Sequence, residues 1–196
     1  MGIRPARDPD ARFSRGDEAE RILGVDPGTL HTGWGLVEVT GESLHYLAHG
    51  TIGSPRNKDQ GSRLRCIYRG LKEVLFRYEP QGISLEKIFF SRNAQSALKL
   101  GQARGVAILA AAESGIDIHE YSSTEIKLAV VGYGHASKLQ VMKMVASLLH
   151  PSSRVSADAA DALAAAICHL HQWSYHARVV AALPSTGQER RRWGTS

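Results

Sequence analysis

The sequence predicts an α/β fold built on a mixed five-stranded sheet, with three antiparallel strands first, then parallel strands, and helices flanking the sheet. Three strand patterns between Ile22 and Ile52 follow one another closely, which suits antiparallel pairing because parallel strands need a long crossover. The apolar period then changes to that of a helix, and helical and strand patterns alternate up to Tyr121. The predicted order is three strands, helix, strand, helix, strand and two final helices.

Three consecutive strands are expected at 22–26, 33–39 and 44–52. Each is a short apolar run bounded by glycine or polar residues, as is typical of strands. Gly41 falls in the turn between the second and third strands. The short connections predict an antiparallel meander, and residues 53–60 follow it as a polar loop.

A helix is expected at 64–78, where apolar residues recur at spacings of three and four and Pro80 ends the pattern. The apolar run 83–90 is expected to be a buried strand that leads into a loop. A second helix then continues to a stop at Gly115. Its predicted inner stripe consists of Ala94, Ala97, Leu98, Gly101, Gly105, Ile108, Leu109 and Ala112.

The last elements are a short strand at 117–121 and two helices. Ser137 is the expected N-cap of a helix through Leu149, which Pro151 stops. Ser156 is the expected N-cap of the final helix, which is apolar almost all round. The chain therefore ends on helices that can cover the sheet.

One folded domain is expected at 21–175, between a flexible polar extension at 1–20 and a flexible basic tail at 176–196. Cys66 and Cys168 lie far apart without CxxC partners, so we expect core cysteines in a reducing compartment rather than a zinc site or disulfide framework. The sequence has no signal-peptide pattern and no apolar run of membrane-spanning length. We therefore expect a cytoplasmic protein without membrane contact.

Four acidic residues occupy apolar surroundings, where a carboxylate must neutralise, pair with a base or bind a metal. Asp26 ends the first strand at the turn Pro27–Gly28, and Glu86 lies within the fourth strand pattern. Asp158 and Asp161 are three apart near the start of the last helix and share one of its faces. Strand ends are where α/β proteins build sites. No Lys or Arg is near the helical pair in sequence, which predicts a divalent cation.

Carboxylate ligands favour magnesium, and two ions about 3.5–4 Å apart would suit cleavage of a phosphodiester. The net charge of +5 at pH 7 supports a polyanionic partner. Taken singly, each acid also has an ordinary explanation. Asp158 could be a helix-dipole partner, Glu86 could pair with Lys87 or Arg92, and Asp26 could belong to a plain turn. The prediction depends on the four acids occurring together.

Five segments in order resemble the RuvC family of Holliday-junction resolvases (crossover junction endodeoxyribonucleases), which have a ribonuclease H-like fold. The resemblance extends from about Ile22 to His171 and covers nearly all of the predicted domain. The segments are 24–28 with 33–35, Leu85–Glu86 with Phe89, 93–105, 130–134 with Ala136 and Lys138, and 158–163.

The resemblance implies a magnesium-dependent endonuclease that resolves four-way junction DNA by paired symmetric nicks, in homologous recombination and DNA repair. Asp26, Glu86, Asp158 and Asp161 match the family's catalytic acids. They would hold two Mg²⁺ ions per active site, with Mn²⁺ as a substitute. The resemblance also implies a homodimer, with the helix at 93–115 as the expected interface, and cooperation with the RuvAB branch-migration complex.

Nucleic-acid contacts are expected from Phe89, Lys127, Lys138 and Arg92. By resemblance, Phe89 would stack on or wedge apart bases at the crossover, and the two lysines would hold phosphates and support catalysis. Core packing is the alternative for Phe89, because Phe90 follows it directly and strand alternation sends the two rings to opposite faces. Solvated surface lysines are the alternative for Lys127 and Lys138.

Three other functions remain open on the sequence. Asp26-Pro27-Gly28-Thr29 resembles a phosphate loop of actin-like ATPases and sugar kinases, but those proteins need a second related lobe and the chain has no internal repeat. A DNA-binding module that has lost catalysis is disfavoured because all four acids are present. The strongest alternative is a related nuclease that acts on RNA ends or on another branched substrate.

Overall fold

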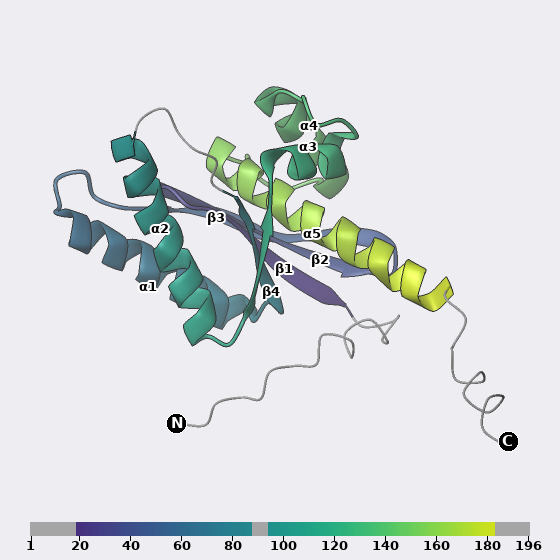
Figure 1. The fold of residues 1–196 in the computed structure, drawn as a ribbon, viewed down its shortest axis with the longest axis horizontal. Helices are drawn as coiled ribbons and strands as arrows, with labels where there is room; N and C mark the ends of the chain where they lie inside the picture. Colours follow the sequence, from purple (N-terminus) through teal and green to yellow (C-terminus); the bar gives the residue numbers. More distant parts are fainter. Residues whose placement is uncertain (1–18, 88–93, 183–196) are drawn as a thin grey trace, which may run out of the picture.

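The computed structural model describes residues 19–87 and 94–182. Its centre is a single sheet with helices on both faces (Figure 1). Alternate side chains of the central strand point to opposite faces, as the strand period requires. Ile22 therefore belongs to one group of buried apolar residues, and Leu23 and Val25 belong to the other.

The sheet has the strand order β3-β2-β1-β4-β5. β1 (Glu20–Asp26) pairs antiparallel with β2 (His31–Thr40), and β2 pairs antiparallel with β3 (Ser43–Gly53). β4 (Gly82–Glu86) runs parallel to β1, and β5 (Asp117–Tyr121) runs parallel to β4. The mixed five-stranded sheet predicted from the sequence is confirmed, with β1 at its centre.

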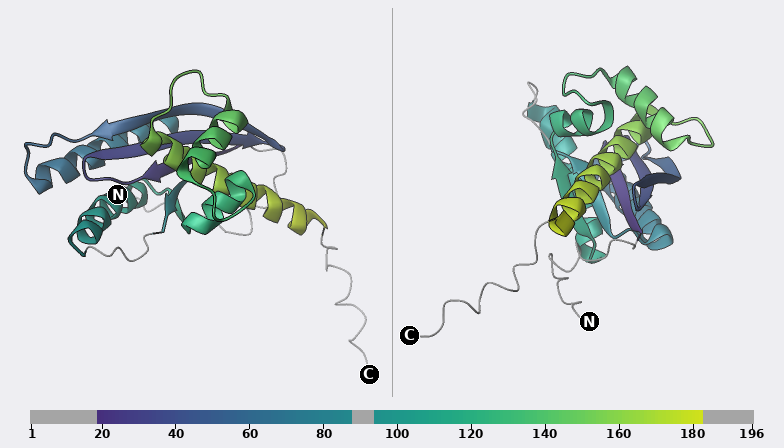
Figure 2. Two further views of the ribbon diagram at one scale, coloured as in Figure 1. Left: turned by 90° about the horizontal axis from the view of Figure 1, so that it is seen from above. Right: turned by 90° about the vertical axis from the view of Figure 1, so that its right-hand side faces the viewer.

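The helices divide between the two faces of the sheet (Figures 1 and 2). α1 (Gln60–Tyr78) and α2 (Ala94–Glu113) enclose one apolar core. α3 (Ser123–Val131), α4 (Lys138–Leu149) and α5 (Ala157–Ala182) enclose the other. α5 lies directly on β1 and β2, while α3 and α4 pack against α5. The start of α5 is thereby placed on the sheet itself.

The helix caps follow local sequence signals. Ser137 N-caps α4, and the Ser156 hydroxyl accepts a hydrogen bond in the first turn of α5, so both predicted caps are confirmed. α3 was not predicted, although its signals are present. Ser122 and Glu125 form a reciprocal capping box, and Gly132 ends the helix with a φ of 91°. A helix of nine residues is too short for an apolar period to reveal it.

The predicted inner stripe of α2 is wrong. Leu98 and Leu109, two of its three large members, are 69% and 51% exposed, and only the third, Ile108, packs partly buried against the core. α2 is apolar on two faces, so periodicity alone could not decide which face meets the core. Small side chains permit the closer approach to α1 and β5. The buried residues are Ala103, Ala107, Ala110 and Ala111.

The ends of two other elements differ from expectation. β4 stops at Glu86, and α5 continues to Ala182, past the predicted domain end at 175. The extra helix has a local cause, because neither glycine nor proline occurs between Ser156 and Pro184. Of the predicted extension at 1–20, residues 1–18 lie outside the described residues and Glu20 already begins β1; of the predicted tail at 176–196, residues 183–196 lie outside them. Within the described ranges, no helix combines the length and apolar character that crossing a bilayer requires.

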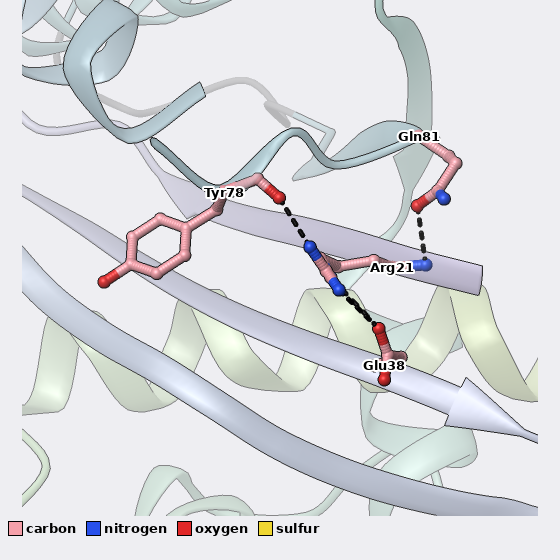
Figure 3. Close-up of polar contacts among 4 residues, drawn as sticks. All are labelled: Arg21, Glu38, Tyr78 and Gln81. Atoms are coloured by element: carbon pink, nitrogen blue, oxygen red, sulfur yellow. Dashed lines mark hydrogen bonds and ion pairs between the residues drawn. The ribbon is translucent and has the colours of Figure 1, made fainter. Parts of the chain in front are cut away.

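Arg21 ties together several elements at the start of β1, away from Asp26 (Figure 3). Its guanidinium donates to the Glu38 carboxylate on β2 at 2.8 and 3.1 Å and to the Tyr78 carbonyl of α1 at 2.8 Å. Its backbone N–H donates to Gln81 Oε1 at 2.8 Å. These contacts join β2, the end of α1 and the entry to β4 around the first residues of β1.

Candidate active site

Asp26 and Glu86 lie at the end of the sheet where β1 and β4 terminate, and this end is called the acidic edge below. Each is the last residue of its strand, and β1 and β4 are adjacent and parallel with Val25 opposite Leu85. Parallel strands that are in register at the preceding residues bring their carboxyl ends side by side. The sheet topology therefore places these two acids together, although 60 positions separate them in the sequence.

Asp158 can lie close to this edge because the residue of β2 that it packs against is a glycine, Gly33. Gly33 is paired with Asp26 in the sheet. A Cβ atom at Gly33 would lie 2.1 Å from the Asp158 carbonyl oxygen and 2.8 Å from its Cβ. The first turn of α5 therefore rests on the backbone of β2, immediately beside the end of β1. The glycine makes room for an acid-bearing helix.

Two more glycines allow the same close packing further along α5. A Cβ at Gly24 would lie 1.7 Å from the Ala162 carbonyl oxygen, and one at Gly35 would lie 2.4 Å from Cγ of Leu163. The buried Ser84 hydroxyl of β4 donates to the Ala165 carbonyl at 2.7 Å. These contacts hold α5 in one position on the sheet, so the direction of its two aspartates is set by the fold.

Charge concentrates around Asp26. Burial, followed by the negative charges of Asp161, Asp158 and Glu86, raises the pKa of Asp26 to about 7, and Lys138 opposes the rise. The structure thus brings together all four acids singled out in the sequence. Within 19–87 and 94–182, however, no three His, Cys, Asp or Glu side chains already form a metal-ligand cluster.

Lys138 is the base that sequence proximity did not reveal. It is the first residue of α4, and its Nζ lies 2.9 Å from Asp161 Oδ2. No Lys or Arg was taken to lie near the helical acid pair in sequence, but the fold brings Lys138 to Asp161 from a different helix. A hydrogen bond to Asp161, together with its charge and those of Asp26 and Glu86, raises the pKa of Lys138. The lysine side chain is 80% exposed, so it also faces solvent at the site.

Of the other predicted DNA contacts, only Lys127 belongs to the described residues. Lys127 lies half-buried on α3 and is not among the charged groups that shift the pKa of Asp26. Phe89 and Arg92 fall in 88–93, outside the described part of the chain. Lys87 was the alternative partner predicted for Glu86. In the structure its charge helps to lower the pKa of Glu125, after the larger effect of hydrogen bonds from Ser122.

Arg104 on α2 was missed by sequence reasoning. Its Nη1 donates to the Glu86 carbonyl at 2.6 Å, and its Nη2 forms an ion pair with Glu120 of β5. Desolvation lowers the pKa of this guanidinium. A signal was available, since Arg104 is a charged residue within the apolar half of α2 and lies in the segment 93–105 that carries the family resemblance. What periodicity could not show is which backbone it would meet.

Comparisons with known proteins agree with this architecture. The family model described as "Crossover junction endodeoxyribonuclease RuvC" matches residues 22–169. The crossover junction endodeoxyribonuclease RuvC of Geobacter metallireducens is 48% identical over 76% of this chain and 91% of its own. RuvC from Thermus thermophilus, solved in complex with a Holliday junction substrate, superposes with a TM-score of 0.75 at 31% identity, over 81% of this chain and 97% of its own.

A more distant structure shares the fold. The yeast mitochondrial Holliday junction resolvase superposes with a TM-score of 0.62 at 14% identity, over 86% of this chain and 84% of its own. The family match covers four strands in full, most of β1 and all four converging acids, and the bacterial relatives match over most of both chains. The chain therefore belongs to the RuvC family of crossover junction endodeoxyribonucleases.

Proposed function

We propose that this crossover junction endodeoxyribonuclease cuts Holliday junctions by metal-dependent hydrolysis at Asp26, Glu86, Asp158 and Asp161, in homologous recombination and DNA repair. One observation carries the assignment of the site. Burial, followed by the charges of three carboxylates from β4 and α5, raises the pKa of Asp26 at the end of β1 to about 7. Folding has concentrated negative charge at one sheet edge, which is the requirement of a divalent-cation site.

The donor set fits magnesium, with manganese as a substitute, because both prefer carboxylate oxygens and water. Two ions at the four acids are the arrangement we infer. When bound, divalent ions supply charge stabilisation to the attacking and leaving oxygens of a phosphodiester. The contribution of the chain is to hold the carboxylates on rigid elements, with Asp26 and Glu86 on adjacent strands and the two helical aspartates on α5.

Lys138 joins the acids to the DNA in this proposal. Its exposed ammonium can bind a phosphate oxygen at the edge of the site while remaining within reach of Asp161. Lys127, Phe89 and Arg92 stay predicted DNA contacts. Action on DNA also supports the cytoplasmic location expected from the sequence, and RuvAB remains the predicted partner in branch migration.

A homodimer is supported by the outer face of α2. Most of the residues first predicted to face the core recur at helical spacing on this face, where the large ones are Leu98 and Leu109, whereas Ile108 packs partly against the core. Gly101 and Gly105 lie in the middle of this face, and a Cβ atom at either position would meet nothing within 4 Å. The centre of the face is therefore unobstructed and has no projecting side chain. We infer that two copies of α2 pack against each other here. A two-fold dimer would suit two symmetric nicks in a four-way junction.

Leu109→Glu is expected to convert the dimer into a monomer, because each of the two copies would place a charge in the apolar contact. Sedimentation velocity on the full chain measures the change. Leu128→Glu is the control, since Leu128 is 56% exposed on α3, across the sheet from α2. A Leu109→Glu variant that sediments like the unmodified chain would exclude α2 as the interface.

The function is tested with a labelled synthetic four-way junction. With Mg²⁺, we expect paired symmetric nicks on the junction and none on a matched linear duplex, and we expect EDTA to stop the reaction. Asp161→Asn is expected to bind the junction without cutting it, because one metal-binding carboxylate is lost while the DNA-binding surface is kept. Denaturing gels measure cleavage, and a gel-shift assay measures binding.

The alternatives give different outcomes. An intact junction beside cleavage of RNA ends or another branched substrate would replace the junction assignment with the runner-up nuclease activity. Binding without cleavage in both Mg²⁺ and Mn²⁺ would indicate a DNA-binding module. Full cleavage by Asp161→Asn would remove Asp161 from the proposed site.

A further inference from the structure

Arg104 joins three elements at the acidic edge of the sheet. It projects from α2, and its side chain is only 12% exposed. One guanidinium nitrogen donates to the Glu86 carbonyl of β4 at 2.6 Å, and another pairs with the Glu120 carboxylate of β5. A planar guanidinium offers several donors in a rigid fork, so both partners are held in a defined relation to each other.

The bond to Glu86 is made where the sheet contacts of β4 end. Glu86 is the last residue of the strand and is paired with Tyr121 of β5. The following N–H, that of Lys87, donates to the Tyr121 carbonyl at 2.7 Å. Arg104 binds the carbonyl of the same peptide unit, between Glu86 and Lys87. That peptide is therefore held from two sides, and its orientation sets the direction from which the Glu86 side chain leaves the backbone.

We propose that Arg104 is a positioning residue for the nuclease reaction, which orients Glu86 for metal binding through its backbone carbonyl. The proposal rests on the proposed function, in which Glu86 is one of the four metal-binding acids. Arg104 does not touch the substrate in this proposal. It supplies a fixed backbone that keeps the Glu86 carboxylate aimed at the charge cluster around Asp26.

The ion pair with Glu120 has a separate role. A guanidinium with little exposure needs charge neutralisation, and Glu120 provides it. The Glu120 side chain is itself 40% exposed, so water can solvate it when its partner changes. Loss of the ion pair and loss of the carbonyl contact should therefore have different consequences, and single substitutions can separate them.

α2 also carries the face that we propose as the dimer contact. Gly105, on that outer face, directly follows Arg104 in the helix. The same turn of α2 thus contacts the partner copy on one side, under the dimer proposal, and the Glu86 backbone on the other. Arg104 gives a direct mechanical connection between the position of α2 and one acid of the site.

The test compares Arg104→Met with Glu120→Gln and Arg104→Lys in the full-length chain. Arg104→Met removes both contacts, and Glu120→Gln removes only the charge of the ion pair while it keeps an acceptor. Arg104→Lys keeps a donor for the Glu86 carbonyl. Mn²⁺ binding, followed by electron paramagnetic resonance without DNA, is the readout that does not depend on activity. The Mg²⁺ dependence of junction cleavage and the metal-free junction affinity complete the set.

We expect Arg104→Met to weaken Mn²⁺ binding and to raise the half-saturating Mg²⁺ concentration by about tenfold, a typical effect of losing a residue that orients a metal ligand. Junction affinity without metal should not change. Arg104→Lys should restore most of the metal affinity, and Glu120→Gln should resemble the unmodified chain. A purely structural role would lower thermal stability without moving the metal dependence of the folded enzyme.

Two results would overturn the inference. One is an unchanged metal affinity in Arg104→Met, and the other is an equal loss in Glu120→Gln, which would assign the effect to the ion pair. Glu86→Gln separates this failure from that of the proposed function. If Glu86→Gln binds metal and cuts like the unmodified chain, Glu86 is not a metal-binding acid and the proposed site fails first.

Discussion

Asp26→Asn is expected to slow metal-dependent cleavage severely while making the metal-free protein more stable at pH 8. Burial and three neighbouring carboxylates raise the pKa of Asp26 from 3.8 to about 7, so its ionised form is disfavoured in the fold. Asparagine carries no charge and avoids this cost, but it cannot supply the same negative ligand. Loss of a few kcal/mol of charge stabilisation would slow cleavage by a factor on the order of 1,000.

The pH dependence of stability has a definite sign. Below pH 3.8 the Asp26 carboxyl is protonated in both states and contributes nothing. Between 3.8 and about 7 the folded state holds a proton that the unfolded state has released, so the free energy of unfolding falls as pH rises. At pH 8 the penalty reaches up to about 4 kcal/mol, since each pKa unit corresponds to about 1.4 kcal/mol.

Thermal unfolding with EDTA, at about pH 5 and pH 8, measures this effect. The Tm advantage of Asp26→Asn should grow between the two pH values, and Mg²⁺ should then raise the Tm of the unmodified chain more than that of the variant. Glu73→Gln, at an exposed acid on α1, is the control and should match the unmodified chain. A Tm advantage that shrinks with rising pH would contradict the assigned electrostatics, and residual full activity would contradict the site.

Gly24→Ala is expected to lower the free energy of unfolding by more than about 3 kcal/mol, at the upper end of overpacking effects. The added Cβ would lie 1.7 Å from the Ala162 carbonyl oxygen, which belongs to the backbone of α5 and cannot rotate away. The helix would have to move off the sheet and take Asp158 and Asp161 with it. Metal-dependent cleavage by the remaining folded protein should therefore fall as well.

Gly53→Ala provides the matched control. Gly53 ends β3, and a Cβ there would meet nothing within 4 Å. Its substitution should change stability by less than about 1 kcal/mol, because the alanine adds no clash. Urea unfolding followed by circular dichroism compares the two variants. Similar midpoints for Gly24→Ala and Gly53→Ala would show that α5 does not depend on the close contact with β1.

Much of this architecture can be predicted because its signals are local. Short connections between apolar runs predicted the antiparallel strands, and Ser137 and Ser156 predicted the starts of two helices. The acids were singled out because each lies in an apolar stretch of sequence, where a carboxylate requires a special explanation, although in the structure Glu86 is exposed and Asp158 and Asp161 are half-buried. Asp26 and Glu86 could even be expected at one edge, since parallel strands share the direction in which they end.

Other features depend on contacts between distant segments. α2 has two apolar faces, and only packing against α1 and β5 showed that four of its alanines are buried and that Leu98 and Leu109 are exposed. The ion pair of Lys138 with Asp161 joins residues 23 positions apart on different helices. No pattern within either helix could have predicted that pairing.

The sequence by itself determined the strands and most of the helices, because these follow from local periodicity and capping, and it singled out the four acids that we propose as the metal-binding site. Tertiary structure alone decided which face of α2 is buried, that Lys138 meets Asp161, and that Arg104 holds the backbone of Glu86. It also showed why Gly24 and Gly33 are glycines, since α5 crosses their strands too closely for a side chain. The physical reason is that the local sequence determines which secondary structure a segment prefers, whereas the fold of the whole chain determines which other segments it packs against.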